Sequence, residues 1–482
     1  MDLRCSRHVL GGLILAVAGA AALDAEESPA SKAMPSAARP NIILIVADDL
    51  GYGELGCYGG KEIPTPNLDT LARNGVRFTS GYVSCPVCSP TRAGLITGRY
   101  QQRFGHEFNP GAAVLREGVE FGLPLSEVTL AERLQAAGYA TGMVGKWHLG
   151  PGEKYHPLRR GFQEYFGFLG GAHPYLPAAT AAKKKAAQRQ DVFRGFDPVR
   201  ETEYLTDAFT REAVAYVKAH KDRPFFLYLT YNAVHSPLQA IEKYSSRFAG
   251  INDARRRTFA AMLSALDDGV GAVLGALREA AIEEKTLVFF ISDNGGPTPL
   301  TTSGNGPFRG YKAQALEGGI RVPFLVQWKG RLPAGKTYDA SVISLDIVPT
   351  ALAAAGVSLA ADAKIDGVDL LPHLTGKTEK PPHEALFWRF GQWSAIRKGP
   401  WKLLKERGAW RLFDLSSDLG EAKDLAAEKK DLVAEMKGEL ERWEAQLAEP
   451  LWGRNVQTAG PKQKAARKKQ AVPGETAAPK AQ

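Results

Sequence analysis

The chain has few cysteines and, beyond its N-terminus, no long hydrophobic run. Of its four cysteines among 482 residues, Cys5 lies in the N-terminal segment, which leaves Cys57, Cys85 and Cys88. This scarcity excludes a fold stapled by disulfides. No stretch after residue 23 reaches the roughly 20 consecutive apolar residues that a membrane span needs. We therefore expect no stable membrane insertion once an N-terminal signal is removed.

The first 23 residues have the layout of a secretory signal. Arg4 and Arg7 precede an apolar run over residues 9–23, and Ala20 and Ala22 offer a cleavage site between small residues. This pattern predicts a signal peptide over residues 1–22 and a secreted or periplasmic protein. An uncleaved anchor is the alternative interpretation. A lipoprotein is not indicated, because no cysteine follows the run.

The positive charge is concentrated at the C-terminus. Of the formal net charge of +9, a surplus of +6 follows Trp452, where seven basic residues face the single acid Glu475. This segment, over residues 453–482, is rich in Pro, Ala and Gln and has no hydrophobic periodicity. It is therefore predicted to be a disordered tail, and the charge does not indicate a nucleic-acid partner.

The length favours two domains, and the pattern favours an α/β fold. Apolar runs over 41–47, 225–230 and 286–292 predict strands buried on both faces, and helical patterns over 130–137 and 254–281 lie between them. From about residue 381, short Trp- and Phe-rich segments predict an antiparallel sheet, followed by a helix over 429–447. The predicted divisions are a linker (23–39), a catalytic domain (40–378) and a C-terminal subdomain (379–452).

One short segment identifies the chemistry. Cys88-Ser-Pro-Thr-Arg92, running on to Thr97-Gly98-Arg99, resembles the C-x-P-x-R signature of the type I sulfatases, of the arylsulfatase and N-acetylgalactosamine-6-sulfatase kind. The resemblance implies an alkaline-phosphatase-like fold: a large mixed sheet flanked by helices, with a smaller C-terminal antiparallel sheet and helix. It also implies that a formylglycine-generating enzyme converts Cys88 to formylglycine (3-oxoalanine), whose hydrate attacks sulfate esters. Cys85-x-x-Cys88 leaves a redox or zinc interpretation open, although zinc would need a second pair of ligands.

Acidic and amide residues follow two of the predicted strands. Asp48 and Asp49 follow the first strand, and Asp293 and Asn294 follow the strand over 286–292. Oxygen ligands of this kind suit a hard divalent cation, although turn residues and helix caps are the ordinary explanation of each pair alone. The strings A-D-D-L-G-Y-G and S-D-N-G also resemble the sulfatase family. The resemblance implies one Ca²⁺ held by these four residues and by the modified Cys88.

Three further motifs supply cations and imidazoles. Gly145-Lys146-Trp147-His148 matches the family's G-K-W-H, and in an extended segment Lys146 and His148 would point to the same side. The segment 232–237 places His235 in the family's N-x-P-H-x-P pattern, with Val234 in place of the proline. Lys312 lies in an R-G-x-K motif, where the resemblance implies a contact with sulfate. The following E-G-G-I-R-V-P motif carries Glu317 and Arg321, which we expect to be structural.

The residues of these motifs suit sulfate transfer. A sulfate monoester repels nucleophiles because its oxygens are negative, and Arg92, Lys146, Lys312 and calcium would offset that charge. His235 or Lys312 would protonate the leaving alcohol, and His148 would remove the proton of the second hydroxyl of the hydrate so that sulfate leaves.

The substrate is predicted to be an extracellular sulfate ester, and a sulfated carbohydrate is the expected class. His106 and Asn109, just past the nucleophile helix, are candidates for recognising its hydroxyls, and His173 is a further candidate for the substrate pocket. Glu54 stands where the family usually has Asp. Two alternative functions stay open: a phosphonate or phosphate ester hydrolase of the same superfamily, and a carbohydrate-binding protein that has kept only the fold.

Overall fold

The computed structural model describes residues 39–109, 119–177, 191–360 and 363–453. The predicted signal peptide (1–22), the predicted linker (23–39) except its last residue, and the predicted tail (453–482) except its first residue lie outside the described residues.

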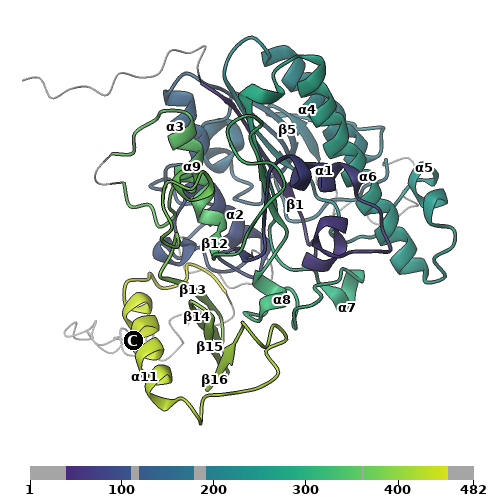
Figure 1. The fold of residues 1–482 in the computed structure, drawn as a ribbon. Helices are drawn as coiled ribbons and strands as arrows, with labels where there is room; N and C mark the ends of the chain where they lie inside the picture. The colour runs from purple at the N-terminus through teal and green to yellow at the C-terminus, as the bar shows by residue number, and fades with distance from the viewer. Residues whose placement is uncertain (1–38, 110–118, 178–190, 361–362, 454–482) are drawn as a thin grey trace, which may run out of the picture. The chain divides into compact units, whose positions relative to one another are not determined.

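A ten-stranded mixed sheet forms the centre of the protein (Figure 1). In spatial order its strands are β11 (Lys336–Tyr338), β2 (Val76–Phe78), β10 (Phe324–Gln327), β9 (Thr286–Ser292), β1 (Asn41–Ala47), β8 (Phe225–Thr230), β4 (Ala140–Lys146), β5 (Glu164–Phe168), β6 (Val192–Arg194) and β7 (Asp197–Val199). The five strands β9, β1, β8, β4 and β5 are parallel to one another, whereas β10 and β6 run antiparallel to both of their neighbours. The central strands β1, β8 and β9 are fully buried apolar runs, as parallel strands covered on both faces require.

Helices cover both faces of this sheet (Figure 1). Alternate residues of β1 point to opposite faces, so Ile43 and Ile45 belong to one apolar cluster and Ile42, Leu44 and Val46 to another. The first cluster includes side chains of α1 (Pro66–Asn74), α4 (Leu205–His220) and α6 (Ala254–Glu279), and the second includes α2 (Cys88–Thr97), α3 (Leu130–Ala136) and α9 (Ile347–Ala354). The remaining short helices are α5 (Glu242–Ser245), α7 (Thr298–Thr301), α8 (Glu317–Ile320) and α10 (Leu371–Leu374).

Helix α6 has the length and apolar composition of a membrane span, which the sequence pattern did not lead us to expect after residue 23. Of its most apolar 18-residue window, 78% is buried inside the protein, as in the core helix of a globular domain. Among the described residues it is the single helix that meets these criteria.

The C-terminal part contains the predicted small antiparallel sheet. Its strands are β13 (Ala385–Phe390), β14 (Trp393–Lys398), β15 (Trp401–Glu406) and β16 (Ala409–Asp414), paired in chain order, and α11 (Lys430–Glu444) packs on β13, β14 and β15. A separate parallel pair joins β3 (Gly81–Tyr82) to β12 (Val342–Ile343). A large mixed sheet with flanking helices and a small C-terminal antiparallel sheet confirms the predicted fold class.

Two buried ion pairs tie the C-terminal part to the rest. Lys402 of β15 is fully buried, and its Nζ lies 2.8 Å from Glu317 Oε1 and 2.8 Å from Glu421 Oε1. Glu317 begins α8, so this contact joins the small sheet to the segment that carries Lys312. Separately, the buried Asp346 carboxylate lies 2.8 Å from His383 Nε2.

Candidate active site

The acidic residues that follow β1 and β9 meet at one edge of the sheet. The two strands are parallel neighbours with Ala47 paired to Ser292, so the residues after them leave the sheet together. The Asp49 N–H donates to Asp293 Oδ1 at 3.2 Å, and Asn294 Nδ2 donates to Asp49 Oδ1 at 2.7 Å. All four predicted metal ligands of this edge are at most 1% exposed.

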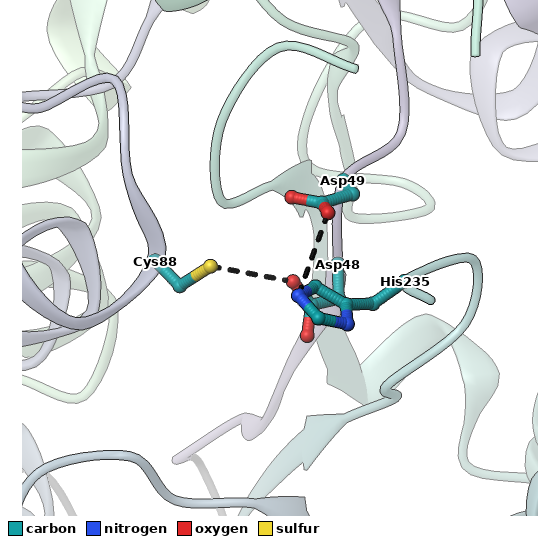
Figure 2. Close-up of side chains that lie close together, drawn as sticks. All are labelled: Asp48, Asp49, Cys88 and His235. Carbon is teal, nitrogen blue, oxygen red and sulfur yellow. Dashed lines mark hydrogen bonds and ion pairs between the residues drawn. The ribbon is translucent and has the colours of Figure 1, made fainter. Parts of the chain in front are cut away.

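Cys88 faces these carboxylates from the first residue of α2 (Figure 2). Its Sγ lies 3.6 Å from Asp48 Oδ1. Pro90 lies in the first turn of the helix, where its missing N–H costs no hydrogen bond. One turn after Cys88, Arg92 donates to Asp293 Oδ2 from Nε at 3.0 Å and from Nη2 at 2.8 Å, so the helix brings the nucleophile position and this guanidinium to the same edge.

Two lysines complete the charge balance of the site. Lys146, the last residue of β4, places Nζ 2.5 Å from Asp48 Oδ2. Lys312 places Nζ 2.6 Å from Asp49 Oδ1 and 3.1 Å from Cys88 Sγ. Burial alone would raise the carboxyl pKa values. The surrounding cations, with Lys146 foremost for Asp48 and Lys312 for Asp49, outweigh it and lower both pKa values, so both carboxyls are ionised.

His148 and His235 flank this charged group. β4 ends at Lys146 and His148 has a left-handed backbone with φ of 60°, so the alternation of an extended strand, from which we expected the two side chains on the same side, does not reach His148. Burial, and then the nearby cations led by Lys146, hold the pKa of His148 well below its ordinary value, so its imidazole is neutral and able to accept a proton. His235 Nε2 lies 3.6 Å from Asp49 Oδ2, and its Nδ1 lies 2.6 Å from the Ser236 carbonyl oxygen.

The residues present fit a hard cation. One ligand atom each from Asp48, Asp49, Cys88 and His235 lie within 4.8 Å of one another (Figure 2). Asp49 Oδ2 and Asn294 Oδ1 are buried acceptors without a hydrogen-bond partner, and such oxygens are the ligands that Ca²⁺ prefers. Burial, as the largest effect, raises the pKa of the Cys88 thiol to about 12, so the unmodified side chain is a neutral, soft sulfur that suits this cation poorly.

The redox and zinc interpretations find no support among the described residues. Cys57, Cys85 and Cys88 form no disulfide there, and Cys85 is not part of the group of possible metal ligands.

Two of the three predicted substrate residues, His106 and Asn109, contact Ser89, the residue after Cys88. His106 is fully buried and its Nε2 lies 2.7 Å from Ser89 Oγ, while Asn109 Oδ1 accepts from the Ser89 N–H at 2.9 Å. His173 is half-buried, with its ring 5.1 Å from that of Phe168, and its carbonyl oxygen accepts from Asn232 Nδ2 at 3.4 Å. None of these contacts supports hydroxyl recognition by His106, and for Asn109 and His173 it stays a prediction.

Several residues that shape the site were not predicted to do so from the sequence. A Cβ on Gly171 would lie 2.6 Å from His148 Nε2, so the glycine makes room for that ring. Val234 donates its N–H to the Asp48 carbonyl oxygen at 2.8 Å, a bond that the family's proline could not make. Glu54 pairs with Arg256 through both carboxylate oxygens, at 2.8 and 2.9 Å. Only Val234 and Glu54 gave a signal in the sequence, as departures from the family pattern.

Comparison with known proteins assigns the family. The model of the sulfatase domain matches residues 40–357, and the model of the C-terminal part of N-sulphoglucosamine sulphohydrolase matches residues 311–446. The chain belongs to the sulfatase family. It is a hydrolase that acts on sulfate esters.

Similar proteins share most of this sulfatase's length. N-acetylgalactosamine-6-sulfatase of Sus scrofa is 36% identical over 400 residues, which cover 75% of this chain and 74% of that protein. Arylsulfatase A of Homo sapiens is 38% identical over 374 residues, covering 72% and 70%. Among solved structures, Ps i-CgsB in complex with k-i-k-neocarrahexaose superimposes with a TM-score of 0.80 at 36% identity, covering 90% of this sulfatase and 98% of that chain.

Proposed function

We propose that this sulfatase removes sulfate from an extracellular sulfated carbohydrate, using formylglycine made from Cys88 and one bound Ca²⁺. The observation that carries the proposal is the surroundings of Cys88. Its Sγ lies 3.1 Å from Lys312 Nζ and 3.6 Å from Asp48 Oδ1, beside two buried oxygens without hydrogen-bond partners.

The charges around Cys88 suit a sulfate ester better than a free thiol. Formylglycine would supply a carbon with two hydroxyls, one to attack sulfur and one whose deprotonation lets sulfate leave. Ca²⁺ would supply positive charge at the sulfuryl oxygens. The residues that would hold it are Asp48, Asp49, Asp293, Asn294 and the modified Cys88.

The chain's own residues divide the remaining work. Lys146 and Lys312 offset the charge of the sulfuryl oxygens, and Arg92 fixes Asp293. His235 or Lys312 donates a proton to the leaving alcohol oxygen. His148, kept neutral by burial and by the neighbouring cations, accepts a proton at its imidazole and so completes the cycle.

A carbohydrate substrate is supported by the relatives, two of which are named for or bound to sugars. The predicted signal peptide supports a secreted or periplasmic location, where sulfated polysaccharides occur. We accordingly propose sulfated oligosaccharides as the substrate class, with k-i-k-neocarrahexaose as the first compound to test.

Mass spectrometry of the purified native protein tests the nucleophile. The peptide that contains Cys88 should be lighter by about 18 Da than its cysteine form, because the modification replaces H and SH by a carbonyl oxygen. The Cys88→Ala variant should hydrolyse no 4-nitrophenyl sulfate. An unmodified thiol in protein from its own host would overturn the proposed mechanism.

The remaining alternatives are separated by substrate. Faster turnover of 4-nitrophenyl phosphate or of a phosphonate ester than of the sulfate would favour the phosphate or phosphonate hydrolase. Sugar binding without hydrolysis, equal in wild type and Cys88→Ala, would favour the binding protein.

A further inference from the structure

Ser89, the residue after Cys88, connects two histidines. Its Oγ donates to the His148 carbonyl oxygen at 2.7 Å and lies 2.7 Å from His106 Nε2. A carbonyl oxygen only accepts hydrogen bonds, so the single hydroxyl hydrogen of Ser89 is used in the bond to the His148 carbonyl oxygen. His106 must therefore donate its Nε2–H to Ser89 Oγ. The result is a directed chain from His106 through Ser89 to the backbone of His148.

This chain is enclosed by aromatic rings. His106 is fully buried, and its ring lies 4.7 Å from the ring of Trp452 and 5.5 Å from that of Phe121. Trp452 is itself fully buried and donates from Nε1 to the Phe108 carbonyl oxygen at 2.6 Å. Burial also lowers the pKa of His106 to about 3, so the ring remains neutral over the working range of an enzyme. Substrate hydroxyls have no access to His106 or Ser89, because both are 0% exposed.

His148, whose carbonyl oxygen is the last acceptor in this series of hydrogen bonds, has an unusual backbone conformation. His148 has a φ of 60°, in a region that costs a non-glycine residue energy and that persists only where the surroundings hold it. Its N–H donates to the Leu169 carbonyl oxygen at 3.1 Å, and its carbonyl oxygen receives the Ser89 hydroxyl. Ser89 thus holds one of the two bonded backbone groups of His148, and Gly171 lies on one side of its ring.

We propose that Ser89 and His106 are positioning residues that fix the His148 imidazole. Asn109 holds Ser89 in place, because its Oδ1 accepts from the Ser89 backbone N–H. Neither Ser89 nor His106 touches the reacting atoms. The inference rests on the proposed function, in which His148 accepts a proton in the step that releases sulfate. It replaces hydroxyl recognition as the role of His106, whereas for the half-buried Asn109 hydroxyl recognition stays a prediction.

Three variants of the full-length protein test the hydrogen bonds from His106 through Ser89 to His148. Ser89→Ala removes the central hydroxyl. His106→Phe keeps an aromatic ring against Trp452 but removes the N–H, and His106→Gln restores a donor. We expect kcat for 4-nitrophenyl sulfate to fall about 10- to 100-fold in the first two, as for other displacements of a reacting group by about 1 Å, with KM changed less than about 3-fold. His106→Gln should recover part of the loss.

Two readouts separate positioning from a general loss of structure. Because His148 acts after the alcohol has left, both weak variants should release about one equivalent of 4-nitrophenol per converted Cys88 in a burst before slow turnover. The double variant Ser89→Ala/His106→Phe should have a kcat no lower than that of the slower single variant, since both residues act through the same series of hydrogen bonds. Losses that multiply, or slow turnover without a burst, would overturn the inference.

The controls keep its failure distinct from that of the proposed function. Ser264→Ala removes another buried hydroxyl, which accepts from Arg247 at 2.7 Å on α6, and should leave kcat unchanged. Conversion of Cys88 is measured by mass in every variant, and kcat is normalised to it, because Ser89 lies inside the C-x-P-x-R motif. An active wild type with equally active Ser89→Ala would overturn only this inference, whereas converted wild type without sulfatase turnover would overturn the proposed mechanism.

Discussion

Adding one methyl group at Gly171 should displace His148. The new Cβ would lie 2.6 Å from Nε2 and 2.8 Å from Cε1 of the imidazole, and ordinary contacts begin at 3.4 Å, so the ring must retreat by about 0.8 Å. The backbone on either side of the ring is held by Ser89 and by Leu169, so the ring cannot simply follow a shift of the chain.

A displacement of this size has a large expected effect on turnover. Misplacing a reacting group by about 1 Å costs up to about 100-fold in rate, equivalent to roughly 2.7 kcal/mol of transition-state free energy. We therefore expect kcat of Gly171→Ala for 4-nitrophenyl sulfate to fall about 10- to 100-fold. KM should change little, because the contacts assigned to the sulfuryl group come from Lys146 and Lys312.

The assay is steady-state hydrolysis, normalised to the mass-determined conversion of Cys88. Gly250→Ala is the matched control, since a Cβ there would meet no atom within 4 Å. In a His148→Ala background the clash is gone, and Gly171→Ala should have no further effect on residual turnover. A wild-type kcat in Gly171→Ala would refute the assigned position of the imidazole.

Three further predictions concern stability. Lys402→Met should lower the free energy of unfolding by about 3–5 kcal/mol, because it removes the buried cation from Glu421 and leaves Glu317 paired with Arg321 alone. Lys398→Met at an exposed pair should cost less than about 1 kcal/mol, and equal losses in denaturant titrations would contradict this. Burial alone would lower the pKa of His383, but the Asp346 carboxylate outweighs burial and raises this pKa above 6.5. The stability that the protonated His383 contributes is therefore full below pH 6.5 and is lost as the pH rises through the raised pKa. The Tm of His383→Gln should therefore vary less with pH above 6.5 than that of wild type, and parallel curves would exclude the effect. Chelation should lower Tm, and Ca²⁺ at about 100 times its Kd should restore about 2.7 kcal/mol, while an unchanged Tm would exclude a stabilising site.

Several of the long elements were predicted closely from the sequence, although the helix α4 and the strand β4 were not predicted. The runs over 41–47, 225–230 and 286–292 are the strands β1, β8 and β9 with the same bounds, and helices predicted over 130–137 and 254–281 end only one or two residues earlier. These elements are long and strongly periodic or continuously apolar, so local composition was enough. The short strands β2, β6 and β12 were not predicted, because two or three residues carry no period and exist only through their partners.

The residues of the candidate site were predicted from motifs. The features that were not predicted depend on contacts between residues far apart in the sequence. The aspartates, Cys88 and the two lysines do lie together. The burial of His106 could not be predicted, because it depends on Trp452, which is distant in sequence. The left-handed backbone of His148 was missed because a match to an extended strand says nothing of where that strand ends.

Trp452 has a consequence for the order in which the protein is made. Its indole bonds to Phe108 across 344 positions of the chain, and the neighbouring Leu451 N–H donates to the Gly105 carbonyl oxygen at 2.9 Å. During synthesis the N-terminal residues emerge first, so Cys88, Lys146 and His148 leave the ribosome well before this closing segment exists. The growing chain thus passes through an interval in which the residues of the site are present but the wall behind His106 is open. The pocket around His106 can therefore close only after Trp452 has been made and has packed against that ring.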